Sequence, residues 1–175
     1  MVRALKSITF FYVPREDRVL AVVNAGREDS WSCWLTRRVV LALLDRGAGY
    51  VQSKSQLAQR APAELRRDVI AFERDAAIAR TAGAMSVTPA NVLQTNVAGA
   101  ELADRLTIAQ HGNGFRLELR GQAEAGAVGL FTPAELQRTL QMLHGEAIKA
   151  AWLVAPVPAP APSPAAAGGA KPVAN

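Results

Sequence analysis

The fold is decided by residues 7–36, which read SITFFYVPREDRVLAVVNAGREDSWSCWLT. Within them, three runs rich in aromatic and β-branched residues are separated by turn-forming segments that begin at Pro14 and Ala25. The runs cover residues 7–13, 18–24 and 30–35. Aromatic and β-branched side chains suit the half-buried surface of a sheet, and Pro, Asp and Gly favour tight turns. The stretch therefore predicts three strands joined as a β-meander.

Two helices are predicted after this meander. Thr36 is a suitable N-cap for a helix from Arg37 to about Arg46, with Gly47 as its C-terminal stop, and its many apolar residues predict burial against the sheet. Residues 48–60 are expected to form a loop. A longer helix is predicted over 62–81, with a heptad-like apolar stripe that we expect to face the core. The stripe consists of Leu65, Val69, Phe72, Ala76 and Ala79.

The second half predicts more strands and a last helix. Strands are expected over 92–97, 106–110, 115–120 and 127–131. The segment 111–114, HGNG, is typical of a hairpin turn, and the alternation in FRLELR after it places Phe115, Leu117 and Leu119 on the buried face. Thr132 and Glu135 form a capping-box pattern that begins a helix to about Trp152. Its expected core stripe is Leu136, Leu140, Leu143, Ala147 and Ala151.

These elements predict an α+β fold, with antiparallel sheet(s) from β-meanders packed against about three helices. A meander that leads through Thr into a Leu-rich helix occurs twice, so a duplicated meander–helix unit is one interpretation, with halves 1–84 and 85–155. In element order, such a chain resembles single-strand-binding transcription-factor folds built from two such units, but the resemblance implies no binding residues. Residues 1–155 are expected to form one domain, and the Pro/Ala-rich segment 156–175 a disordered tail.

Charge and cysteine content narrow the classes of protein. The formal net charge is +5. Residues 1–88 hold 14 Lys and Arg against 9 Asp and Glu, whereas 89–155 hold 5 against 6, so the excess lies in the first half. Cys33 is the only cysteine, which excludes an internal disulfide. Without a secretory signal pattern or an apolar run long enough to span a bilayer, we expect a cytoplasmic protein that does not bind membranes.

Few residues offer chemistry. His111 is expected in a solvated turn, and His144 near the end of the last helix, capping a turn or facing water. Cys33 lies between two tryptophans on a predicted strand, where a buried, inert thiol is expected. The carboxylates at the turns are expected to be solvated; they are Glu16, Asp17, Glu28, Asp29 and Asp104. No catalytic residue, metal site or cofactor is predicted.

A candidate nucleic-acid surface is the strongest remaining feature. Strand alternation places Trp34 on the face opposite Trp31, and an exposed Trp34 beside arginines would form a stacking platform for single-stranded nucleic acid. The six candidate residues are Trp34, Arg37, Arg38, Arg60, Arg67 and Arg74. The interpretation that we favour is different: Trp34 packs under a helix, and the arginines pair with acidic residues of the same helix.

The sequence therefore favours a non-enzymatic protein-interaction or assembly module, whose partner is another protein or a second copy of the chain. The scarcity of reactive side chains and the expected open sheet edges support this hypothesis. A single-stranded nucleic-acid-binding module is the alternative, and an enzyme of unrecognised type is the third possibility.

Overall fold

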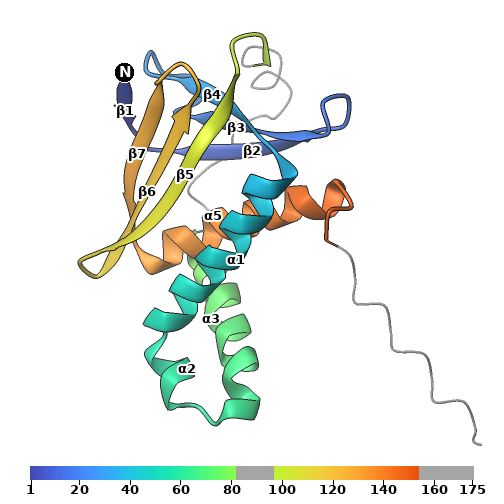
Figure 1. Cartoon of the computed structure of the whole chain (residues 1–175). Coiled ribbons are helices and arrows are strands. Elements are labelled where there is room, and N and C mark those ends of the chain that lie inside the picture. Colours follow the sequence, from blue (N-terminus) through green and yellow to red (C-terminus); the bar gives the residue numbers. More distant parts are fainter. Residues whose placement is uncertain (82–96, 154–175) are drawn as a thin grey trace, which may run out of the picture.

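The computed structural model describes residues 1–81 and 97–153, apart from the side chains of Arg67, Arg74, Ala77, Ile78, Arg80 and Thr81. It has an α+β fold, in which a seven-stranded sheet packs against helices (Figure 1). The predicted tail over 156–175 and the predicted strand residues 92–96 lie outside the described residues. Within the described ranges, no helix combines the length and the apolar character needed to cross a bilayer.

The sheet is mixed, which corrects the prediction of a purely antiparallel one. The strands are β1 Val2–Ala4, β2 Ile8–Val13, β3 Arg18–Val23, β4 Trp31–Leu35, β5 Glu101–His111, β6 Gly114–Gly121 and β7 Gly126–Phe131, in the order β1-β7-β6-β5-β4-β3-β2. Two meanders, β2-β3-β4 and β5-β6-β7, are antiparallel as predicted, but β5 lies parallel to β4 and β1 parallel to β7. The parallel pairs arise because long crossover segments, unlike tight turns, return the chain to the same end of the sheet.

The helices differ in length from the predicted ones, since the first is longer and those predicted over 62–81 and from Thr132 to about Trp152 are shorter. They are α1 Arg37–Lys54, α2 Gln56–Arg60, the short 3-10 helix η1 Ala63–Leu65, α3 Arg66–Thr81 and α5 Pro133–Lys149. Gly47 does not end α1, and most of the predicted loop over 48–60 is helical. Gly47 instead allows a close helix contact, because a Cβ there would lie 2.5 Å from Cδ2 of Leu140 on α5. The prediction that Gly47 ends the helix was therefore wrong. This glycine instead allows Leu140 of α5 to pack closely against α1.

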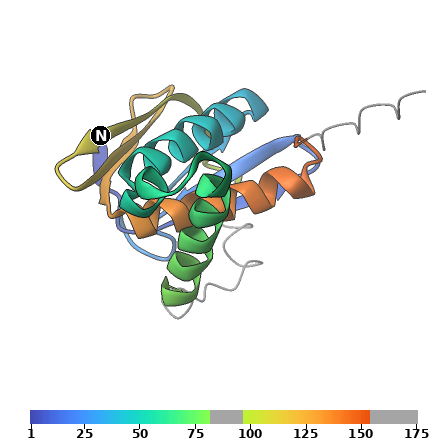
Figure 2. The same cartoon turned by 90° about the horizontal axis from the view of Figure 1, so that it is seen from below.

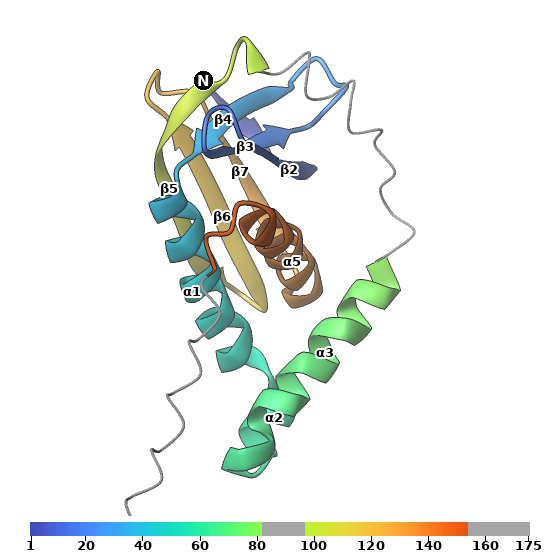
Figure 3. The same ribbon diagram turned by 90° about the vertical axis from the view of Figure 1, so that its right-hand side faces the viewer.

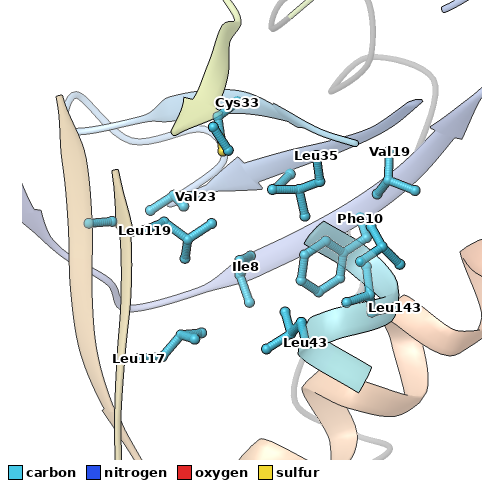
Figure 4. Close-up of a cluster of buried hydrophobic side chains, with 14 of the residues drawn as sticks. Ile8, Phe10, Val19, Val23, Cys33, Leu35, Leu43, Leu117, Leu119 and Leu143 are labelled. Carbon is cyan, nitrogen blue, oxygen red and sulfur yellow. The ribbon is translucent and has the colours of Figure 1, made fainter. Parts of the chain in front are cut away.

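The main core lies between the sheet and the crossing helices α1 and α5. Side chains of β2, β3, β4, β6, α1 and α5 meet there, among them Phe10, Leu35, Leu43, Leu117 and Leu143 (Figure 4). The alternation in β6 is confirmed, since Phe115, Leu117 and Leu119 are buried. Figure 2, which is seen from below, shows the two helices crossing in front of the sheet.

The capping box of α5 is confirmed. The Glu135 amide donates to Thr132 Oγ1 at 3.2 Å, and the Thr132 amide donates to Glu135 Oε2 at 2.8 Å. These reciprocal bonds satisfy amides that the first helical turn leaves unpaired, so local sequence alone determines where α5 begins.

Asn24 ties the start of the chain to the end of β3. It is fully buried and has a positive φ of 52°. Its Oδ1 accepts hydrogen bonds from the amides of Lys6 and Ser7, at 2.9 and 3.1 Å. Its Nδ2 donates to the carbonyl oxygen of Ala4 at 2.8 Å and to Asp29 Oδ2 at 3.0 Å. One side chain thus fixes the link between β1 and β2.

The helices α2 and α3, with η1 between them, project from the body of the molecule (Figure 3). We call residues 56–81 the helical arm. Its helix α3 contacts α5 and α2. The apolar stripe predicted to face the core does not do so throughout, because Leu65 is 49% exposed, Phe72 is 70% exposed and Ala79 is exposed. Helical periodicity predicted an apolar face correctly, but it contains no information on what covers that face.

Candidate functional site

Trp34 is buried, in agreement with the interpretation favoured from the sequence, but among the described residues it packs with strand and loop side chains and not under a helix. The alternative, an exposed stacking ring, is wrong. Trp34 is 8% exposed and forms a second apolar cluster with Leu20 and Val22, on the sheet face opposite the main core. Partly buried residues around it include Phe11 and Leu102. The strand pairings place Leu20 of β3 and Leu102 of β5 on either side of Trp34. All five residues of β4 are buried.

The other sequence-predicted residues do not form one surface. Arg37 is exposed, and its Nη2 donates to the carbonyl oxygen of Trp152 at 3.3 Å. Arg60 is exposed at the end of α2, which belongs to the helical arm, whereas Arg37 and Arg38 lie at the start of α1. Arg67 and Arg74 belong to α3, but their side chains lie outside the described part of the structure. Arg38 lines a groove, and it is the one residue of the six whose described surroundings fit an anion.

This groove lies between α1 and β5, and we call it the arginine groove. It has a volume of about 360 Å³ and is lined by Arg38, Val39, Ala42, Leu43 and Arg46 of α1 and by Asp104, Arg105, Leu106 and Ile108 of β5. Arg38 and Arg46 are eight residues apart, which separates them by about 12 Å along a helix. The lining thus combines three arginines with apolar residues and one acidic residue, Asp104.

The three arginines of the groove are free to bind a ligand. Within residues 1–81 and 97–153, Arg38, Arg46 and Arg105 form no ion pair or hydrogen bond through their side chains. With Asp104, the lining carries a formal charge of +2. Guanidinium groups suit phosphate oxygens because they donate paired hydrogen bonds. The groove can therefore hold an anionic group.

The neighbouring recess on β6 is not basic. Its lining holds two arginines against three acidic residues, namely Arg105 and Arg120 against Asp104, Glu118 and Glu124. Glu118 accepts from Arg120 Nε at 2.7 Å and from Arg116 Nη1 at 2.8 Å. The hydrogen bond from Arg120 is the main cause that lowers the pKa of the Glu118 carboxyl. Arg116 and Arg120 are therefore already paired with Glu118. Of the arginines that line this recess, only Arg105 also belongs to the arginine groove.

Sequence reasoning missed Arg46 and Arg105. Arg38, Ala42 and Arg46 are spaced by four residues, so a helix predicted to continue beyond residue 46 would have placed both arginines on one face. Arg105 gave no such signal, because its approach to α1 depends on the tertiary fold.

Cys33 and the histidines behave differently from one another. Burial, and to a lesser degree the charge of Glu101, raises the pKa of the fully buried Cys33 thiol to about 12, so it stays protonated at neutral pH. This confirms the predicted buried thiol. His111 is exposed, as predicted, but it is the last residue of β5, directly before the turn. Among the residues that the structure describes, no group of three or more His, Cys, Asp or Glu fits a metal ion.

His144 lies elsewhere than predicted. It is half-buried on α5 and neither caps the helix nor lies open to water, since its Nδ1 is buried without a hydrogen-bond partner. It lines a half-open cavity of about 250 Å³ between α1, α3 and α5, which we call the helical pocket. The other lining residues are Leu44, Ala48, Val51, Gln52, Ile70, Gln137, Leu140 and Gln141.

The helical arm carries the third feature, an exposed apolar surface. Leu57, Leu65 and Phe72 are 57%, 49% and 70% exposed. They are three of the eight exposed large hydrophobic residues in the described ranges, gathered within residues 57–72. Single exposed apolar residues are ordinary, but a concentration of them on one projecting segment makes the arm a candidate interaction surface.

Comparison with family models, curated proteins and solved structures finds no match to this chain. Function is therefore inferred from the helical arm and the arginine groove.

Proposed function

We propose that this chain is a non-enzymatic interaction module that assembles with a second copy of itself through the helical arm. The observation that carries the proposal is the exposure of Phe72, at 70%, on a helix that projects from the body. Burying one such side chain against a partner contributes about 1.5–3 kcal/mol. In the isolated chain the apolar ring of Phe72 is exposed to water, which is unfavourable. Packing against a partner would remove this ring from water.

The spacing of the apolar residues supports helix pairing. Positions 65, 69, 72, 76 and 79 alternate steps of four and three, which is typical of the seam between two paired helices. Leu65 and Phe72 are seven residues apart, so they lie on nearly the same side of the helix. Both are exposed, so this side is open to a partner.

Charge favours a second copy as the partner. The helical arm, residues 56–81, contains five arginines and four acidic residues, a formal charge of +1, whereas the whole chain carries +5. Two arms can therefore approach with little net repulsion, while pairings through more strongly basic surfaces are opposed. Alternating signs beside an apolar seam also offer cross-helix ion pairs.

The proposal is tested by co-expressing two copies with different affinity tags and recovering one through the other. We expect the wild-type pair to co-purify and Phe72→Glu in both copies to abolish co-purification. Leu130→Glu is the matched control, because Leu130 is 64% exposed on β7, away from the arm. Failure of the wild-type copies to co-purify, or equal loss in both variants, would contradict assembly through the arm.

A second candidate function, binding of single-stranded nucleic acid, is supported by the arginine groove. Three unpaired arginines predict a salt-dependent affinity, with a slope of log K against log salt of about −2 for single strands. The measurement is fluorescence anisotropy of a labelled oligonucleotide at low and near-physiological salt. Arg105→Ala should weaken binding and make the slope shallower by about 0.7. Arg27→Ala, an equal charge change in an exposed turn, is the control; equal effects of the two changes would argue against the groove.

We also propose that the two halves are copies of one meander–helix unit. The support is the shared order β2-β3-β4-α1 and β5-β6-β7-α5, and a threonine at both helix N-caps, Thr36 and Thr132. An alignment of homologous sequences is the test: residues 18–36 and 114–132 should match each other above chance, and no match would count against duplication.

A further inference from the structure

The arginine groove combines basic and apolar residues in one small cavity, and its acidic residue lies at a β-bulge. We propose that this groove binds one nucleoside phosphomonoester, with the terminal phosphate on the arginines and a hydroxyl or amino group of the nucleoside on Asp104. The proposal deepens the second candidate function and rests on the same groove, and it is independent of assembly through the arm.

The size of the groove selects a single small ligand. β4 pairs with β5 as far as Leu102, and after Leu35 the chain turns into α1, which contacts β5 (Figure 3). The cavity between α1 and β5 has a volume of about 360 Å³. Small-molecule sites have volumes of roughly 300–1,000 Å³, so the groove has room for one nucleotide and not for a length of polymer.

The charge of the lining matches a terminal phosphate. Arg38, Arg46 and Arg105 together with Asp104 give a formal charge of +2. A phosphomonoester carries about −1.5 to −2 at pH 7, whereas each phosphodiester inside a strand carries one negative charge. Since guanidinium groups donate paired hydrogen bonds to phosphate oxygens, the groove should favour a terminal phosphate over an internal one.

Asp104 lies in the groove because of an irregularity in the sheet. Ala103 of β5 is opposite Gly121 of β6. Arg105, two residues later on β5, is opposite Arg120, only one residue away on β6, so Asp104 is the extra residue of a β-bulge. Adjacent residues of a regular strand point to opposite faces, yet Asp104 and Arg105 line the same groove. Bulges redirect side chains in this way and are frequent beside functional sites.

The carboxylate of Asp104 selects the rest of the ligand. It repels a phosphate and accepts hydrogen bonds, so it favours a ligand that also carries a donor, such as a ribose hydroxyl or a base amino group. The apolar lining residues Val39, Leu43, Leu106 and Ile108 offer contact to a sugar and a base. Aliphatic side chains do not distinguish one base from another, so the proposal concerns nucleotides as a class.

The test is calorimetric titration of the full chain at low salt with AMP, adenosine and phenyl phosphate, each separately. We expect AMP to bind more tightly than adenosine, which lacks the phosphate, and than phenyl phosphate, which lacks the donor groups of the nucleoside. Arg46→Gln should weaken AMP binding about 5- to 12-fold, between the upper value for an exposed ion pair and the lower value for a hydrogen bond to a charged group. Arg15→Gln, in the exposed turn between β2 and β3, is the matched control and should leave AMP binding nearly unchanged.

Asp104→Ala separates the two contacts. Phenyl phosphate should bind this variant at least as tightly as the wild type, because a negative charge beside the phosphate is lost. The advantage of AMP over phenyl phosphate should shrink, because the acceptor for the nucleoside is lost. An undiminished advantage, or equal effects of Arg46→Gln and Arg15→Gln, would overturn the proposal, and circular dichroism verifies that each variant is folded.

A labelled oligonucleotide with and without a 5′-phosphate distinguishes the sources of the phosphomonoester. Tighter binding of the phosphorylated strand identifies a strand end as the ligand, whereas AMP binding without that difference identifies a free nucleotide. An oligonucleotide that binds equally with and without the 5′-phosphate, while AMP binds no more tightly than adenosine, would overturn this proposal and leave the second candidate function standing. If neither AMP nor the oligonucleotides bind, both are wrong.

Discussion

Replacement of Asn24 by Ala tests how the start of the chain is held to the sheet. Asn24 is fully buried, has a φ of 52°, and hydrogen-bonds two amides and a carbonyl oxygen of residues 4–7. Alanine cannot make these bonds and tolerates positive φ poorly. The change should therefore weaken both the β1–β2 link and the turn after β3.

The expected loss follows from these contacts. These hydrogen bonds are part-buried, and a typical one contributes about 0.5–1.5 kcal/mol net, so the three together contribute about 3 kcal/mol. A left-handed conformation adds about 1 kcal/mol for alanine. The total, about 4 kcal/mol, is a large share of the roughly 5–15 kcal/mol by which domains are stable.

Urea unfolding followed by circular dichroism measures this loss. Asn24→Gly separates the two causes, because glycine accepts positive φ and should lose only the hydrogen-bond part, about 1 kcal/mol less than alanine. Asn113→Ala, in an exposed hairpin turn, is the control and should change stability little. A loss below about 1 kcal/mol for Asn24→Ala would refute the reasoning, since it would mean that water replaces these bonds without cost.

Two further predictions concern packing and pH. Gly47→Ala should destabilise the chain by about 1–3 kcal/mol, because the new Cβ would clash with Leu140. Gly49→Ala lies in open space on the same helix and should stabilise the chain by about 0.5–1 kcal/mol. Thermal unfolding of both variants measures these changes, and equal effects would contradict the prediction. Because burial raises the pKa of the Cys33 thiol to about 12, the unfolded state loses its proton first, so stability should fall as pH rises from about 8.5 toward 12. In Cys33→Ala that fall should be smaller, and an unchanged pH profile would be inconsistent with the buried thiol.

Local patterns predicted the elements with the strongest chemical signals. The capping box at Thr132 and the alternation in β6 are confirmed, because both depend on residues close in sequence. The strand β1 was missed, since three residues show no periodicity, and its parallel partner β7 is far along the chain. Gly47 was misassigned because a glycine that ends a helix and one that admits a neighbouring side chain look alike in sequence.

The candidate surfaces were predicted less well, for a physical reason. The exposure of Trp34 depends on what lies beside β4, and only the tertiary fold places β5 there. The groove around Arg105 likewise needs α1 and β5 together. The sequence did predict the apolar stripe through Phe72. That Phe72 is exposed follows only from the tertiary fold, in which α3 contacts α5 while Phe72 stays open to solvent.

Sedimentation equilibrium of the full chain over a wide range of concentrations tests the proposed assembly most directly. The chain has a mass of 18.6 kDa. We expect the wild type and Leu130→Glu to approach twice that mass as concentration rises, and Phe72→Glu to keep the monomer mass throughout. A wild-type chain that stays monomeric at every concentration, or a Phe72→Glu variant that dimerises like the wild type, would contradict assembly through the helical arm.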